Sequence, residues 1–144
     1  MSNEGTFSVL QSEMDGHPLI AVVDMGLRGY TEKSSVPWFL SVSTPLVSPT
    51  SDGLPTRADA NNVNEWEDGI EQELRGEGRF VYVGRVTWNG HRELLYYVAQ
   101  PEASTKKLQR LIDRRAWRPF AFRCERDDKW EKVSIWLNQP HSAE

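Results

Sequence analysis

The pair Asn89–Gly90 constrains this chain more than any other sequence feature, because it separates two long apolar segments. Asn-Gly is the preferred pair for a two-residue type I′ turn, whose twist matches that of the flanking antiparallel strands. We therefore predict a β-hairpin with strands at residues 79–88 and 91–99. Such a short turn also fixes the register, so that Trp88 lies opposite His91.

Alternation along this hairpin distributes its side chains between the two faces of a sheet. Near the turn, one face is expected to carry Arg85, Thr87 and Arg92, and the other to carry Trp88, His91 and Glu93. Farther away, strict alternation opposes Tyr82 to Tyr97. One face then holds Phe80, Tyr82, Leu95 and Tyr97, and the other Val81, Val83, Tyr96 and Val98. Strands with one solvent-exposed face show a regular alternation of apolar and polar residues, which these segments lack. Both faces of the hairpin are therefore predicted to be covered.

Four further strands are predicted from β-branched and aromatic segments bounded by turn residues. They cover residues 6–12, 19–24, 38–44 and 120–125. The first two flank Asp15–Gly16, a second pair typical of hairpin turns. Segments rich in Gly, Pro and polar residues separate the others and are predicted to be loops.

Two helices are predicted between these strands. The first begins after Thr56, a good N-cap, and ends at Gly76. Its apolar stripe consists of Val63, Trp66, Ile70 and Leu74. The second helix begins at Pro101 and is expected to reach Arg118, where Pro119 stops it. The tail from residue 127 fits either a short helix or a strand.

In this order the elements predict an α+β fold, a ferredoxin-like βαββαβ sandwich. It has an antiparallel sheet, two helices on one face and an added N-terminal β-hairpin. We expect one domain over residues 1–144, comprising the hairpin (6–25), the core (37–126) and the tail (127–144). The face away from the helices needs a cover. We favour the N-terminal hairpin or the tail over the alternatives, which are a partner chain, self-association or a ligand.

Composition excludes several classes of function. A net charge of −4 opposes binding to phosphate backbones, so nucleic-acid binding is not expected. Cys124 is the only cysteine, which excludes an internal disulfide and fits a reducing compartment. The N-terminus lacks a signal-peptide pattern, and the longest apolar run, residues 18–23, is too short to cross a bilayer. We therefore expect a cytoplasmic protein with no membrane partner.

Residue patterns for catalysis or metal binding are not found in the sequence. His17, His91 and His141 are far apart and do not have metal-ligand spacing. Glu67 and Glu71 lie one turn apart on the first helix, where no cleft is expected between them. We predict no catalytic residue, no metal and no cofactor, and the sequence favours a domain that is not an enzyme.

The tip of the central hairpin is the candidate binding surface. Its residues are Arg85, Thr87, Trp88, His91, Arg92 and Glu93. The guanidinium fork suits carboxylates and phosphates, so the two arginines could hold an anionic group of a partner. The alternative is that both arginines pair with acidic side chains of a helix.

Several motifs make the chain similar to one family. They are Asp15-Gly16, Val23-Asp24-Met25-Gly26-Leu27, Pro37-Trp38-Phe39-Leu40, Asp52-Gly53-Leu54, Val83-Gly84-Arg85-Val86-Thr87, Gly90-His91-Arg92-Glu93 and Asp127-Asp128-Lys129-Trp130. Over nearly its whole length the chain resembles the domain-of-unknown-function family numbered 695. The Gly-Arg-x-Thr…Gly-x-Arg-Glu hairpin is the most specific part. One departure is Asn138-Gln139-Pro140, where the family has an aromatic-Pro ending. The resemblance implies a bacterial, cytoplasmic protein and supplies no activity, substrate or cofactor.

The sequence alone therefore determines no function. It favours a non-catalytic protein-interaction or regulatory domain that binds a protein partner or itself through the hairpin tip. The alternative is a small-ligand-binding domain or an enzyme, with a pocket between the sheet and the N-terminal hairpin. Asp24, His91 and Glu93 are then the titratable groups expected in that pocket.

Overall fold

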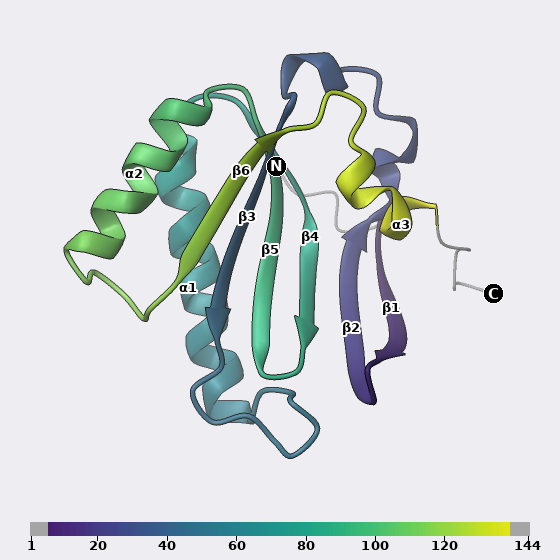
Figure 1. The fold of residues 1–144 in the computed structure, drawn as a ribbon, viewed down its shortest axis with the longest axis vertical. Coiled ribbons are helices and arrows are strands. Elements are labelled where there is room, and N and C mark those ends of the chain that lie inside the picture. Colours follow the sequence, from purple (N-terminus) through teal and green to yellow (C-terminus); the bar gives the residue numbers. More distant parts are fainter. Residues whose placement is uncertain (1–5, 139–144) are drawn as a thin grey trace.

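The computed structural model describes residues 6–138, in which six strands form one sheet (Figure 1). The strands are β1 (Phe7–Met14), β2 (His17–Asp24), β3 (Trp38–Pro45), β4 (Phe80–Trp88), β5 (His91–Val98) and β6 (Ala121–Arg126). Their order is β1-β2-β4-β5-β3-β6, and every neighbouring pair is antiparallel. The predicted α+β class with an antiparallel sheet is confirmed. His141, Gln139 and Pro140 lie outside the described residues.

Two longer helices pack on one face of this sheet. In Figure 1 one of them lies behind the strands and the other lies to the left of β6. They are α1 (Arg57–Arg75) and α2 (Pro101–Asp113). Thr56 caps α1 as predicted, since its hydroxyl accepts from the Asp59 backbone N–H at 3.3 Å. The predicted end of α2 at Arg118 is wrong. The helix ends at Asp113, because Arg115 adopts a left-handed backbone with a φ of 51°.

The helix-facing core joins strands β3 and β5 to both helices. Its buried members include Leu40, Val42, Leu94, Tyr96 and Val98 from the sheet, and Val63, Trp66, Ile70, Leu74, Leu108 and Leu111 from the helices. The apolar stripe predicted for α1 is therefore the buried one. Each such side chain contributes about 1.5–3 kcal/mol on burial, which is why α1 and α2 stay on this face.

A β-bulge in β4 shifts the hairpin by one residue at Val83. Tyr82 lies opposite Tyr96, and Gly84 lies opposite Leu95, so the predicted pairing of Tyr82 with Tyr97 is wrong. The pairs near the turn are as predicted. The helix-facing side holds Phe80, Tyr82, Tyr96 and Val98, and the other side holds Val81, Val83, Leu95 and Tyr97.

Gly84 gives the physical reason for the bulge. A Cβ atom at this position would lie 2.3 Å from the Val22 carbonyl oxygen, so the residue beside β2 must lack a side chain. A glycine inside a strand marks bulges and close backbone approaches of this kind.

The tail of the chain covers the upper part of the sheet face opposite α1 and α2. It contains a 3₁₀ turn (Glu131–Val133) and α3 (Ser134–Leu137), so the tail is helical rather than a strand. Trp130, Val133 and Leu137 pack with Phe39 and Tyr97 in a second buried core. Figure 1 shows α3 in front of the sheet, beside β2. The N-terminal hairpin instead extends the sheet, because β2 pairs with β4.

Trp130 is the central residue of this cover. Its ring stacks on that of Tyr97, with centroids 4.1 Å apart and an angle of 8° between the planes. The ring of Tyr30 lies on it as well, at 5.3 Å. The indole Nε1–H donates to the Val36 carbonyl oxygen at 3.2 Å. The second core is therefore closed by one side chain whose ring stacks on two tyrosines and whose polar group is hydrogen-bonded.

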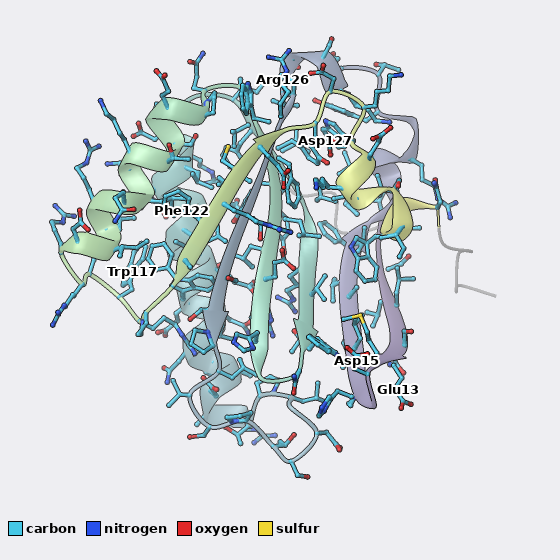
Figure 2. All side chains as sticks on the ribbon, in the orientation of Figure 1. Glu13, Asp15, Trp117, Phe122, Arg126 and Asp127 are labelled. Atoms are coloured by element: carbon cyan, nitrogen blue, oxygen red, sulfur yellow. The ribbon has the colours of Figure 1, made fainter. Side chains whose placement is uncertain are left out.

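Asp127 positions the turn that carries Trp130 (Figure 2). One carboxylate oxygen accepts from the Tyr97 hydroxyl at 2.6 Å and from the Lys132 backbone N–H at 2.8 Å. The other accepts from the Glu131 backbone N–H at 2.9 Å. Burial by itself raises the pKa of Asp127, but these hydrogen bonds outweigh it and hold the pKa below 3.8.

Replacing Asp127 with asparagine is expected to reduce the free energy of unfolding by about 1–2 kcal/mol at neutral pH, because one acceptor oxygen is lost. The folded-state pKa lies below the unfolded one. The contribution of the carboxylate is therefore fully present above the unfolded pKa, and it disappears as the pH falls through the folded value. Urea unfolding at neutral pH and at about pH 3 tests this. The difference between wild type and variant should be smaller in acid, and an equal difference at both pH values would contradict the prediction.

Candidate functional site

The helix-facing half of the hairpin tip is an internal ion-pair cluster. Glu67 of α1 accepts from Arg85 at 3.0 Å and forms a short salt bridge with Arg92. The Arg92 Nε also donates to the Thr87 hydroxyl at 2.7 Å. The Arg92 side chain is only 6% exposed. Pairing of both arginines with a helix acid, the alternative expected from the sequence, is therefore what the structure contains.

The other half of the tip opens onto a hollow of about 410 Å³ on the far face of the sheet. We call this the tip hollow, and its lining residues are Ser41, Ser43, Trp88, His91, Glu93, Ala121, Phe122 and Arg123. In Figure 1 no helix lies in front of the lower parts of β3, β5 and β4. Three of the predicted residues, Trp88, His91 and Glu93, thus share one open site.

Neighbouring strands supply the residues that sequence reasoning missed. Ser41 and Ser43 come from β3, next to β5, and Arg123 comes from β6, next to β3. The Ser41 hydroxyl donates to the Glu93 carboxylate at 2.5 Å. Arg123 is exposed and lies over the Phe39 ring, 6.0 Å from its centroid. The alternation of polar and apolar residues in 38–44 placed both serines on one face, but only the strand order brings them to Glu93.

Hydrogen bonds to neighbouring segments fix the geometry of the tip. The Trp88 indole N–H donates to the Met14 carbonyl oxygen at 2.9 Å, which ties the N-terminal hairpin to β4. On the turn itself, the Gly90 N–H donates to the Gly53 carbonyl oxygen, and the Leu46 N–H donates to the Gly90 carbonyl oxygen, both at 2.8 Å. The tip hollow therefore has a preformed wall.

Asp24 does not join this site. It lies at the end of β2 farthest from the Trp88 pairing, and only 6% of it is exposed. Its carboxylate accepts from the Thr6 hydroxyl and from the Gly26 backbone N–H. Asp24 thus caps a local 3₁₀ turn and does not line the tip hollow with His91 and Glu93.

The remaining titratable side chains add no second chemical centre that the structure describes. Cys124 is half-buried, and burial raises the pKa of its thiol, which favours the protonated form. Within residues 6–138, no three His, Cys, Asp or Glu side chains come together as a metal site. Over the same residues, no helix is long and apolar enough to cross a membrane.

Fold and site together define an α+β domain with an open hollow on an antiparallel sheet. The family model described as "Family of unknown function (DUF695)" matches residues 7–134, and the chain belongs to this family. Comparisons with curated proteins and with solved structures found no significant match. The structure gives each residue of the hairpin motif, on which the family resemblance rested, a position in the fold. Gly84 allows the approach of β2, and Glu93 lines the tip hollow. The two arginines pair with Glu67, and the Thr87 hydroxyl accepts from Arg92.

Proposed function

We propose that this chain is a non-catalytic protein-interaction or regulatory domain whose partner binds at the tip hollow. One observation carries the proposal. His91 and Arg123 are exposed on the two sides of Glu93, and neither has an acidic partner within 4.0 Å in the described part of the chain. Polar groups at the edge of a preformed hollow are available to a binding partner without rearrangement.

The chemistry of the hollow suits a protein surface. Trp88 supplies a half-buried aromatic wall, and Trp and Arg are enriched where protein partners bind most strongly. A loop carrying a carboxylate could pair with Arg123 and accept a hydrogen bond from His91. The whole chain has a net charge of −4, so the exposed guanidinium of Arg123 is a local positive feature that selects an acidic segment.

The proposal includes a ferredoxin-like core over residues 37–126 and a place in the bacterial cytoplasm. Support for the core comes from the strand order β4-β5-β3-β6, with α1 following β3 and α2 following β5, which is the order of a split βαβ sandwich. A single free cysteine supports a reducing compartment.

The experiment first captures binding partners with the wild-type protein. Calorimetry then measures the affinity of the His91→Ala and Arg85→Lys variants for each captured partner. Both residues belong to the same hairpin tip, but Arg85 faces α1. We expect His91→Ala to weaken binding by about fivefold or more, since interface truncations of this kind cost about 1 kcal/mol. Arg85→Lys should bind as the wild type does. Unchanged affinity of the His91→Ala variant for every captured partner would place the binding surface elsewhere.

A small-ligand site in the same hollow is the second candidate. It is favoured by the hydrogen bond from Ser41 to Glu93, which holds a carboxylate in place beside the imidazole of His91. Native mass spectrometry of the purified protein separates the two candidates. A bound small molecule that Glu93→Gln releases supports this second function, whereas capture of a protein partner that His91→Ala loses supports the first.

A further inference from the structure

β6 is an edge strand of the sheet. It pairs with β3, and no described strand lies on its other side. The backbone N–H of Asp127 donates to the Pro37 carbonyl oxygen at 2.8 Å. This bond shows which residues of β6 direct their backbone groups toward β3. In an antiparallel pair the bonded positions alternate. The N–H and C=O groups of Phe122, Cys124 and Arg126 therefore point outward, where they can form hydrogen bonds to a further strand.

We propose that a second copy of this chain supplies that strand, with the two β6 strands antiparallel about a two-fold axis at Cys124. In this register Arg123 lies opposite the partner's Glu125, and Phe122 lies opposite the partner's Arg126. The two-fold axis repeats each pair, as in an isologous dimer. Directly opposed charges and cation–aromatic pairs both stabilise neighbouring strands.

The sequence of β6 selects this register over the neighbouring ones. An axis at residue 123 would oppose Arg123 to its own copy, and an axis at residue 125 would oppose two copies of Glu125. Like charges directly opposite each other destabilise a strand pair. An axis at residue 122 would oppose Arg123 to Ala121 and form no ion pair. The register centred on Cys124 forms two ion pairs between Arg123 and Glu125.

The charges involved are accessible in the single copy. Arg123 is exposed and has no acidic partner within 4.0 Å among residues 6–138. Glu125 is 41% exposed and forms an ion pair with Lys132 at 3.3 Å, and Arg126 is 59% exposed and pairs with Asp128 at 2.7 Å. Exposed ion pairs of this kind contribute about 0–1 kcal/mol, so exchanging them for pairs across the interface costs little.

A groove beside β6 adds apolar area to the same edge. Trp38, Phe122 and Cys124 line it from the sheet, α2 forms its other wall, and its volume is about 660 Å³. The α2 wall carries Glu102 and Lys106 one turn apart, so its charge is mixed and does not repel an identical wall. The partner's β6 strand would place Arg126 over Phe122 at the mouth of this groove.

Sedimentation velocity over a range of protein concentrations tests the proposal through a charge swap. Wild type should form a dimer. Arg123→Glu and Glu125→Arg should each weaken the dimer by about tenfold or more, because two attractive pairs become repulsive. The double variant, which restores opposite charges, should recover the dimer. Arg114→Glu, the same charge change on an exposed residue just after α2, should leave it unchanged.

A monomeric wild type at every concentration, or a double variant as weak as the single ones, would overturn the proposal. Glu125 does not line the tip hollow, so the effect of Glu125→Arg is independent of partner binding there. Loss of the dimer and loss of the proposed function are therefore distinguishable.

Amide hydrogen exchange gives a second readout that only strand pairing predicts. In the dimer the amides of Phe122, Cys124 and Arg126 should exchange more slowly as concentration rises. The amides of Arg123 and Glu125 already face β3 and should not respond. This alternation should vanish in Arg123→Glu, and concentration-independent exchange at all five residues would rule out pairing through β6.

Discussion

Replacing Trp130 with alanine is expected to lower the free energy of unfolding by about 3–5 kcal/mol, the cost of removing a large aromatic ring from a core. The residue is 1% exposed and stacks on both Tyr97 and Tyr30. Its loss leaves a cavity between the sheet and the tail, and it removes the donor to Val36. Urea unfolding followed by far-UV circular dichroism measures the effect.

The Trp130→Phe variant distinguishes the contribution of the aromatic ring from that of the indole N–H. The phenyl ring can still stack on Tyr97, but the hydrogen bond to Val36 is lost. We expect a smaller reduction, about 1–2 kcal/mol, since a buried carbonyl is left unsatisfied. If Trp130→Ala costs less than about 1 kcal/mol, the tail does not close the second core in solution.

Replacing Glu67 with alanine is expected to cost about 3–5 kcal/mol, because it leaves the buried guanidinium of Arg92 without a counter-charge. Arg92 is 6% exposed and Glu67 is 12% exposed, so water cannot replace the carboxylate. Arg85, which is 33% exposed, can turn toward solvent and loses less. Equilibrium unfolding in urea measures the loss of stability. Added salt should recover little of that loss, because the site of the ion pair is buried and dissolved ions do not reach it.

A double variant tests this explanation. In Glu67→Leu with Arg92→Met, both charges are removed together, and replacement of a buried pair by apolar residues is often neutral. We expect most of the lost stability to return. If removing Glu67 costs the same in the Arg92→Met background, the two side chains are not coupled and the internal ion pair does not explain the loss.

Local signals predicted the parts of the fold that depend on neighbouring residues. Asn89–Gly90 fixed the pairs next to the turn, and Thr56 marked the start of α1. The bulge at Val83 was not predictable from alternation, because its cause is the close approach of β2 to Gly84. Likewise Pro119 indicated a stop for α2, whereas the chain leaves the helix earlier, through the left-handed Arg115.

The candidate site was predicted only in part for the same physical reason. Trp88, His91 and Glu93 belong to one hairpin, so strand periodicity placed them on a common face. Ser41 and Arg123 reach that face from other strands, and the order β5-β3-β6 is set by long-range pairing. The pairing of both arginines with Glu67 was anticipated as an alternative, but the choice between it and a binding role depended on how α1 lies across the sheet.

The two cores of the sheet also differ in when they can form during synthesis. The helix-facing core draws its buried residues from the stretch between Leu40 and Phe120. The opposite core needs both ends of the described chain, and the Arg28 side chain donates to the Leu137 carbonyl oxygen across 109 residues. Long loops close slowly, and a nascent chain emerges from its N-terminus. The apolar face of β2 is thus synthesised well before the tail that covers it, so a nascent chain keeps this face exposed until α3 has been made.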